Sequence, residues 1–485
     1  MKYEAVIGLE VHAEFSTNSK MFCACPVVDA TEALPNVAVC PVCAGMPGVL
    51  PVVNEMAVEY AVRVALALNC KVANTSIFDR KNYFYPDLPK GYQISQYQYP
   101  LAEHGQLAID TPQGEKSIRI TRVHMEEDTG KLTHVNKNGE SYSLVDLNRA
   151  GVPLLEIVSE PDMRSVEEVR AYATSLRDIL RYLNVNSGDM EKGVIRFEAN
   201  VSVRPEGSTT LGTRTEIKNL NSFRAMERSV SYQIEQQIAK LERGEVVDQE
   251  TLGWNETLGE TYSQRSKEEA HDYRYFPEPD LPPLVIEDEW IDRIKQDLPE
   301  LPHAKMKRFQ TQYTLTEAVS RLMVEDQVIA DYFEETVRLA LSVPAQNTAS
   351  WIVGEIFGWQ NTSNVSFAEI KVKPDMLAEL IVLVNDGKIN VPTGKIVLNN
   401  MLKSGERPTA IIDKEGLEQI SDMDLIADIV IKVIKENPDE LYKYVNGKEG
   451  LANWFFGKAM GIAKGKANPA ILREELEIQL TRLKK

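Results

Sequence analysis

Apolar and polar residues alternate along several short stretches of the N-terminal half, which predicts strands with one polar face each. Between positions 5 and 14 the odd residues are apolar, whereas Glu10, His12 and Glu14 lie at even positions. Because alternate residues of a strand point to opposite faces, these three side chains share one face. That face is either solvated or part of a functional site.

Three later stretches repeat the pattern. In 195–204 and 213–218, apolar positions alternate with polar and charged ones. The stretch 122–128 does so if the strand stays regular, although two adjacent glutamates leave its phase open. The polar residues concerned are Arg122, His124, Glu126, Glu127, Asp128, Arg196, Glu198, Arg214, Glu216 and Lys218.

Helical spacing interrupts these strands and then takes over the chain. A Ser-x-x-Glu pattern at Ser165 precedes apolar residues at helical spacing up to position 183, and 222–243 has the pattern of a second amphipathic helix. We therefore predict an α+β fold with an antiparallel sheet. Changes in composition and in the spacing of apolar residues define three regions, namely 1–290, 291–408 and 409–485. The last two are predicted to be helical.

The composition is that of a soluble protein with several domains. The 485 residues include 54 Lys and Arg against 72 Asp and Glu, a net charge of −18. No run approaches the ~18 uncharged apolar residues of a membrane helix, and the N-terminus lacks the features of a signal or transit peptide, so we expect a cytoplasmic protein. The net acidity argues against diffuse nucleic-acid binding and confines any such contact to local basic patches.

All five cysteines lie in the first 70 residues. Cys23, Cys25, Cys40 and Cys43 form two pairs, each next to a proline. Four thiolates can serve as the soft ligands of a tetrahedral structural zinc, which leaves no open position for catalysis. The alternative is a set of unmetallated thiols. Cys70 is predicted to be a small core residue.

The acids and the imidazole on the predicted sheet face have the chemistry of a site for a hard divalent cation. Mg²⁺ prefers carboxylate oxygens, often with water and phosphate completing its shell. Arg196 and Lys218 lie among these acids, as a phosphate-handling site requires. The competing interpretation is a solvated sheet face held together by salt bridges, and spacing alone does not decide between the two.

A loop at 80–96 combines cations, prolines and aromatic residues, among them Arg80, Lys81, Tyr83 and Lys90. Such a loop can bind a nucleotide by stacking and guanidinium contacts, or it can be a rigid packed loop. The segment 272–281 partly repeats its composition.

A second basic and aromatic segment lies near the C-terminus. Within 451–473 there is no acid, and Lys458, Lys464 and Lys466 follow three aromatic residues. This positive island in an acidic chain suits contact with an RNA backbone. The alternative is a helix face on which lysines gather by chance.

Several motifs of known chemistry are missing from the sequence. There is no G-x-x-x-x-G-K-[ST] loop, so any use of ATP is not of that type. A Gly-Ser-Ser-Gly stretch of the amidase kind is also absent. The His-x-Gly-His and Lys-Met-Ser-Lys-Ser motifs are absent too, which disfavours an aminoacyl-tRNA synthetase.

Long motifs are spread over essentially the whole chain. They are IGLEVH at 7–12, the run 80–96, HMEED at 124–128, VDLNRAGVPLLE at 145–156, EIKNLNSF at 216–223 and the run 272–281. The chain resembles the B subunit of tRNA-dependent amidotransferases, the GatB family, and 461–469 is similar to the tail shared with YqeY proteins. The resemblance implies a β-rich cradle domain over 1–290 that holds the metal and ATP site, a helical domain over 291–408 and a tRNA-binding tail domain over 409–485.

The resemblance also implies a two-step reaction. ATP phosphorylates the side-chain carboxylate of mischarged Glu-tRNA(Gln), Asp-tRNA(Asn) or both, and ammonia then displaces the phosphate. The ammonia comes from glutamine, which a separate partner protein, an amidase, hydrolyses. Phosphoryl transfer needs metal and cations at the developing charge, which the polar sheet face offers. The implied cofactors are ATP, Mg²⁺ and a structural Zn²⁺, and the implied partners are the amidase (GatA type), a small third protein (GatC type) and mischarged tRNA.

By position, the Mg²⁺ ligands of the family correspond to Glu10, His12, Glu127 and Glu216. Arg196 and Lys218 join the implied catalytic set. The roles of Glu126, Asp128 and Glu198 stay open, and many members have Asp where this chain has Glu198. A different hypothesis is a tRNA-binding scaffold that channels ammonia and performs no phosphorylation.

Overall fold

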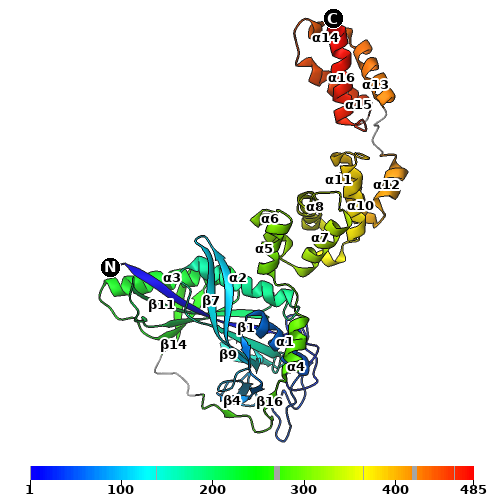
Figure 1. Cartoon of the computed structure of the whole chain (residues 1–485). Coiled ribbons are helices and arrows are strands. Elements are labelled where there is room, and N and C mark those ends of the chain that lie inside the picture. Colours follow the sequence, from blue (N-terminus) through cyan, green and yellow to red (C-terminus); the bar gives the residue numbers. More distant parts are fainter. Residues whose placement is uncertain are drawn as a thin grey trace. The chain divides into compact units, whose positions relative to one another are not determined.

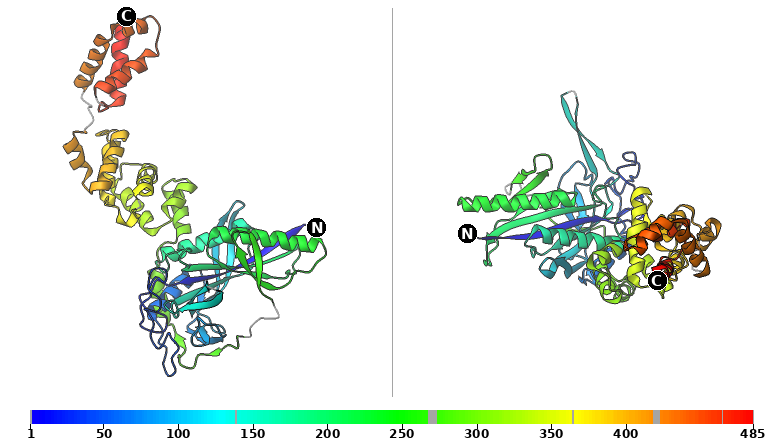
Figure 2. Two further views of the ribbon diagram at one scale, coloured as in Figure 1. Left: turned by 180° about the vertical axis from the view of Figure 1, so that it is seen from behind. Right: turned by 90° about the horizontal axis from the view of Figure 1, so that it is seen from above.

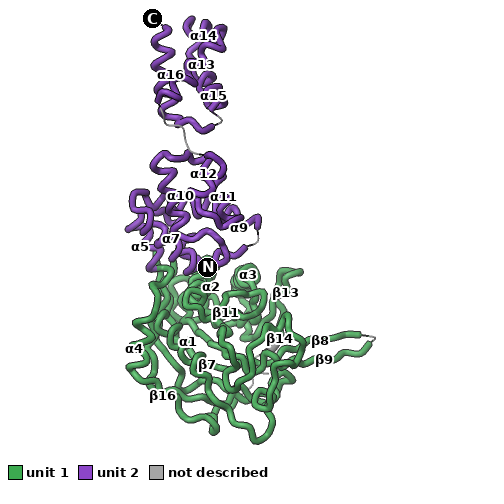
Figure 3. The backbone as a smooth tube through the Cα atoms, turned by 90° about the vertical axis from the view of Figure 1, so that its right-hand side faces the viewer, with its two compact units in different colours: residues 1–303 green, residues 304–485 purple. Residues whose placement is uncertain are grey.

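The computed structural model describes residues 2–137, 139–266, 273–363, 365–417, 423–463 and 465–484. The chain forms two compact units, residues 1–303 and 304–485 (Figure 3). The first unit combines a large sheet with helices and the second is helical, so the predicted α+β class is confirmed.

The centre of the first unit is one sheet of nine strands (Figure 1). These are β1 (Tyr3–Glu14), β2 (Lys71–Val72), β6 (Ala102–Thr111), β7 (Gly114–Glu127), β10 (Pro153–Ser159), β11 (Ile195–Pro205), β12 (Thr215–Leu220), β13 (Glu250–Asn255) and β14 (Glu260–Ser266). Their order is β14-β13-β12-β11-β1-β10-β7-β6-β2. The sheet is not purely antiparallel as predicted, because β12 and β13 run parallel.

Helices cover one face of this sheet and bury its apolar side chains (Figures 1 and 2). They are α1 (Glu55–Ala67), α2 (Val166–Tyr182) and α3 (Phe223–Glu242). Ser165 and Ser222 cap the last two, accepting hydrogen bonds from the backbone N–H groups of Glu168 and Ala225. Both helices therefore begin where their sequence patterns predict.

Smaller elements surround the sheet in the first unit. They are β3 (Thr75–Ser76), β4 (Asp79–Asn82), β5 (Tyr92–Ser95), β8 (Lys131–Lys137), β9 (Glu140–Asp146), β15 (Phe276–Pro277), β16 (Leu284–Val285) and α4 (Asp288–Gln296). Strands β8 and β9 form a hairpin that projects from the sheet (Figure 3). Ile294 of α4 is buried in the core of the first unit, and this unit reaches residue 303.

The second unit is helical throughout its described residues. Its elements are α5 (Pro302–Gln312, which starts at the boundary), α6 (Glu317–Met323), α7 (Gln327–Leu339), α8 (Ala345–Trp351), the π-helix η2 (Ile352–Ile356), α9 (Phe357–Ser363), the 3₁₀-helix η3 (Phe367–Glu369), α10 (Pro374–Asn385), α11 (Val391–Ser404), α12 (Pro408–Glu415), α13 (Met423–Glu436), α14 (Pro438–Val445), α15 (Leu451–Ile462) and α16 (Pro469–Lys484). The last four helices pack around a hydrophobic core of their own. Among the described residues, none of the helices has the length and apolar character that crossing a membrane requires.

Candidate metal and phosphate site

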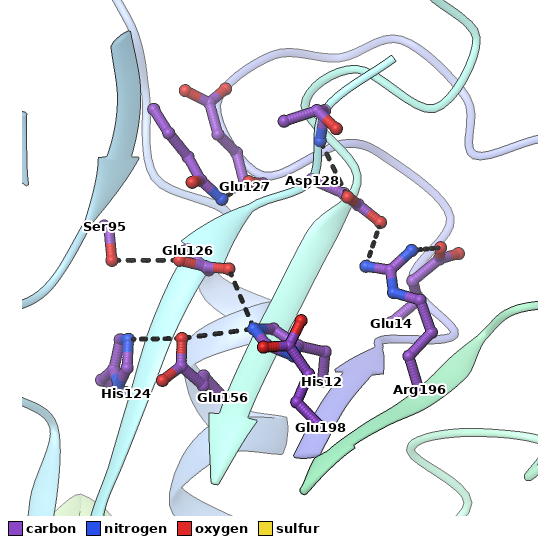
Figure 4. Close-up of polar contacts among 12 residues, drawn as sticks. His12, Glu14, Ser95, His124, Glu126, Glu127, Asp128, Glu156, Arg196 and Glu198 are labelled. Atoms are coloured by element: carbon purple, nitrogen blue, oxygen red, sulfur yellow. Dashed lines mark hydrogen bonds and ion pairs between the residues drawn. The ribbon is translucent and has the colours of Figure 1, made fainter. Parts of the chain in front are cut away.

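The polar face of the sheet is built on its central strands. β1 lies between β10 and β11, and the strand register sets Glu10 beside Glu198 and His12 between Arg196 and Glu156. Apolar residues of β1 are buried against the helices, so the alternation leaves its polar side chains on the other face (Figure 4). The predicted common face of Glu10, His12 and Glu14 therefore exists.

A buried carboxylate, that of Glu156, joins two histidines on this face (Figure 4). Its Oε2 atom lies 3.3 Å from Nε2 of His12 and 3.4 Å from Nε2 of His124. Glu126 completes the group, because its Oε1 lies 3.9 Å from the same His12 nitrogen. Ser95 fixes Glu126 from the other side by donating a hydrogen bond of 3.2 Å to Oε2.

These neighbours determine the charge of the group. Burial alone would lower the pKa of His12, but the hydrogen bond to Glu156 and the surrounding carboxylates raise it to about 9. Burial would likewise raise the pKa of Glu156, yet the charges of His124 and His12 hold it well below its ordinary value. At neutral pH the group is thus an imidazolium–carboxylate pair, and a cation that binds His12 must displace a proton.

A second group on the same face consists of carboxylates. Glu10, Glu198 and Glu216 each place an oxygen within 4.8 Å of the others. Lys218 connects two of them, with Nζ 2.7 Å from an oxygen of Glu198 and 3.2 Å from one of Glu216. Asn200 donates a hydrogen bond of 2.8 Å to Glu10.

The charge of this second group is only partly balanced. Burial and the charges of Glu156 and Glu198 raise the pKa of Glu10, which means that its ionised form is disfavoured. Three carboxylates around one ammonium leave a negative excess that a divalent cation would neutralise. The oxygen donors are those that Mg²⁺ prefers, so the residues present fit this ion.

Arg196 belongs to a separate network at the end of β1 (Figure 4). Its guanidinium donates a hydrogen bond of 2.7 Å to Asp128 and lies 3.6 Å from Glu14. Burial would raise the pKa of Asp128, but the charges of Arg196 and Arg149 lower it to about 2. Burial and the charge of Asp128 raise the pKa of Glu14 to about 8. Arg196, which was predicted to be catalytic, is therefore held by two carboxylates on the same sheet face as the two acid-rich groups.

Glu127 lies apart from both groups, which departs from the predicted ligand set. Its carboxylate pairs with Lys90 and accepts a hydrogen bond of 2.9 Å from the backbone N–H of Ile94. Adjacent strand residues face opposite sides, so Glu126, and not Glu127, shares the face of His12. Because Glu126 and Glu127 are adjacent, the sequence alone did not show which of them faces His12. The register of β7 with β10 shows that it is Glu126.

Two of the four predicted nucleotide-binding residues are engaged in ion pairs. Arg80 donates two hydrogen bonds of 2.7 Å to Glu278, and its guanidinium lies 4.3 Å from the ring centroid of Tyr92. Lys90 is the partner of Glu127. For these two cations the structure matches the interpretation of a packed loop.

Lys81 and Tyr83 lie nearer the polar face. Lys81 Nζ is 5.3 Å from the ring centroid of Tyr273, and the charge of Glu126 counters burial and raises the pKa of this lysine. The Tyr83 hydroxyl donates a hydrogen bond of 3.3 Å to Gln93. The hairpin of β4 and β5 thus brings one lysine close to the carboxylates of the sheet.

The four predicted zinc ligands come together in the first unit. The Sγ atoms of Cys23, Cys25, Cys40 and Cys43 all lie within 4.8 Å of one another, and none forms a disulfide. A zinc tetrahedron with bonds of about 2.3 Å separates its sulfurs by about 3.8 Å. Cys43 lies 3.9 Å from Cys40 and 4.0 Å from Cys25, so the thiols fit this metal. Cys70 is a buried core residue, as predicted.

The basic residues predicted to bind RNA lie in the tail of the second unit. Lys458 is exposed on α15, and its Nζ lies 5.4 Å from the ring centroid of Trp454. Lys466 donates a hydrogen bond to the carbonyl of Gly416. Lys464 lies outside the described residues, as does Asp272 at the start of the motif 272–281.

Sequence reasoning missed Glu156 as a site residue. It is the single charged residue of the largely apolar strand β10, and burying a charge costs free energy unless the charge has a partner. This signal was present in the sequence, although its two histidine partners lie on strands that only the fold brings together.

Comparison with known proteins adds independent findings. The family model of the GatB/GatE catalytic domain matches residues 5–292, and that of the GatB domain matches residues 331–480. The chain is similar to proteins of three bacteria, each named as the B subunit of aspartyl/glutamyl-tRNA(Asn/Gln) amidotransferase. It is 51% identical to that of Thermodesulfovibrio yellowstonii over 98% of both chains. The identity is 50% for Moorella thermoacetica and 49% for Thermoanaerobacter pseudethanolicus, in each case over 99% of this chain and 100% of the relative.

Proposed function

Because the chain belongs to the GatB family, we propose that it activates the side-chain carboxylate of mischarged Glu-tRNA(Gln), Asp-tRNA(Asn) or both for amidation. It then serves as the GatB component of a ligase that forms a carbon–nitrogen bond with glutamine as the amide donor. Its partners in this proposal are an amidase of the GatA type, a small protein of the GatC type and the mischarged tRNA, in the cytoplasm. The cofactors are ATP, Mg²⁺ and a structural Zn²⁺.

The proposed reaction has two steps. A side-chain carboxylate oxygen attacks the γ-phosphorus of ATP, the bond to the bridging oxygen breaks, and ADP leaves with an acyl phosphate formed. Ammonia then attacks the carbonyl carbon, the carbon–oxygen bond to phosphate breaks, and the amide forms with loss of a proton. The first step is needed because an ionised carboxylate is a poor electrophile and its oxygen is a poor leaving group.

The observation that supports this proposal most is the pair of acid-rich groups on one sheet face, with cations among them. Lys218, between Glu198 and Glu216, is placed to balance charge next to bound phosphate. Lys81, close to Glu126, is the best candidate of the four loop residues for a nucleotide phosphate. Preorganised positive charge of this kind lowers the barrier of phosphoryl transfer.

We infer that Glu10, Glu198 and Glu216 hold Mg²⁺, with His12, Glu126 and Glu156 as an adjoining set. This revises the ligands implied by resemblance, in that Glu126 replaces Glu127. When bound, the ion supplies charge compensation for the phosphates of ATP. The chain's own residues fix the carboxylates: Asn200 orients Glu10, and Thr251 orients Glu216 by a hydrogen bond of 2.9 Å.

The experiment is single-turnover amidation of both mischarged tRNAs by the reconstituted complex, with phosphate release from ATP followed in parallel. The variants Glu10→Ala, His12→Ala and Glu216→Ala should each abolish ATP-dependent amidation, while glutamine hydrolysis by the partner amidase survives. A matched control is Glu4→Ala. Glu4 lies on the same strand and face of β1 but pairs with Arg204, outside both groups.

The same experiment separates this proposal from the scaffold hypothesis. A scaffold that only channels ammonia would leave phosphate release intact in all three variants. Near-normal amidation by the three variants would place the phosphorylation chemistry outside this sheet face and overturn the proposal.

A further inference from the structure

Lys20 is a fully buried lysine beside the cysteine cluster. It follows β1, and none of its surface is exposed. Its ammonium donates hydrogen bonds of 2.7 Å to the carbonyl of Ala38 and 3.1 Å to the carbonyl of Leu147, and its Nζ lies 3.6 Å from Sγ of Cys43. An ammonium has three N–H donors, so these three acceptors satisfy it completely.

The ammonium of Lys20 is held by two carbonyls and one sulfur. Among the described residues, no acidic oxygen lies within the 4.0 Å of an ion pair with its Nζ, and two of its three acceptors are neutral carbonyls. A buried ammonium is destabilising unless an anion lies close by. Its third acceptor, the sulfur of Cys43, carries a negative charge in its thiolate form.

A metal bound by four thiolates is negatively charged and is stabilised by a positive charge nearby. Four thiolates and one divalent ion carry a net charge of about −2, and the charge on Cys43, the one buried ligand of the four, is the most costly to leave unbalanced. The backbone N–H of Cys40 already donates a hydrogen bond of 3.2 Å to Cys43. The positive charge of the Lys20 ammonium, next to the same sulfur, offsets part of the remaining negative charge.

We propose that Lys20 is the positioning residue of the metal–thiolate cluster, which neutralises part of the cluster's charge and ties the cysteine loop to the segment between β9 and β10. This inference rests on the proposed structural zinc. The two carbonyl partners of Lys20 come from different segments, one within the cysteine loop and one directly after β9. The backbone N–H of Lys20 also donates to the carbonyl of Cys25 at 3.0 Å, so the residue contacts both halves of the cysteine set.

The test compares Lys20→Met with Lys192→Met in the full chain. Lys192 is a matched control because it also pairs with the cysteine loop, through the carboxylate of Asp29, but is exposed. Competition with a chromophoric chelator should show zinc affinity reduced about 10–100-fold in Lys20→Met and unchanged in the control. In Co²⁺-substituted protein the thiolate-to-metal absorption band should shift only in Lys20→Met, which lost packing alone would not cause.

A second measurement uses the wild-type protein and does not depend on how the variant folds. Acetylation of lysines is followed by mass spectrometry before and after the metal is removed by a chelator. We expect Lys20 to react at least ten times faster in the metal-free chain, with Lys192 unaffected.

Three results overturn the inference. They are equal zinc affinity in Lys20→Met and wild type, an unshifted cobalt band, and a Lys20 reactivity that does not respond to metal removal. A wild-type protein that binds no zinc would refute it together with the structural zinc. Such a result leaves the amidation proposal untouched, because amidation is measured separately.

Discussion

Removing one aromatic ring from the C-terminal helices should unfold the tail and leave the sheet intact. Phe455 on α15 has no exposed surface and belongs to the core formed by α13 to α16. Truncation of a buried Phe to Ala costs about 3–5 kcal/mol. A domain of about 60 residues has a total stability of only about 3–9 kcal/mol, so Phe455→Ala is expected to consume most of it.

The assay combines unfolding with kinetics. Trp454 is the single tryptophan of the four tail helices, and its fluorescence reports their unfolding in urea. We expect the tail of Phe455→Ala to unfold at a clearly lower urea concentration than that of the wild type. The unfolding transition of the first unit should be unchanged. Because the tail is proposed to bind tRNA, KM for aminoacyl-tRNA should rise while kcat changes little.

Phe456→Ala is the matched control. This neighbour is half-buried and lies 4.6 Å from the guanidinium of Arg473, so its loss should cost only about 1 kcal/mol. A tail that unfolds without any rise in KM would contradict its assignment to tRNA. A single transition shared by both units would contradict the independence of the tail core.

Three further predictions concern the first unit and the basic tail. Glu156→Gln should slow single-turnover amidation by at least about 100-fold without disturbing assembly with the amidase, and near-normal rates would remove Glu156 from the site. Elemental analysis should find about one zinc per chain in wild type and none in Cys40→Ala/Cys43→Ala, with stability reduced more than turnover; a metal-free, stable wild type is the contrary outcome. Lys458→Glu should weaken tRNA binding and flatten its salt dependence, whereas an unchanged slope in a salt series would make this lysine part of a solvated face.

The strands whose period is regular could be predicted with their polar faces. In β1 and β11 every second residue is apolar, and both strands bury that side as expected. The serine caps of α2 and α3 likewise mark where these helices begin, because a cap is a local interaction between residues a few positions apart.

Features that depend on contacts between distant segments could not be predicted in this way. The sequence does not specify the register that sets Glu156 next to His12, nor which of two adjacent glutamates faces it. The parallel pairing of β12 with β13 cannot be recognised from the sequence of either strand. Arg80 and Lys90 also could not be recognised as salt-bridged, since their partners Glu278 and Glu127 come from other parts of the chain.

The central position of β1 has a consequence for synthesis of the chain. Strand β1 leaves the ribosome long before its two neighbours, β10 and β11, are made. At 5–20 residues per second, the roughly 200 residues up to the end of β11 take about 10–40 s to appear. Until β10 ends at Ser159, β1 has two unpaired edges, and one of them stays unpaired until β11 follows. Such edges are templates for aggregation. The carboxylate face is accordingly assembled late in translation, and a chain that stops before residue 195 lacks Arg196, Glu198 and Glu216.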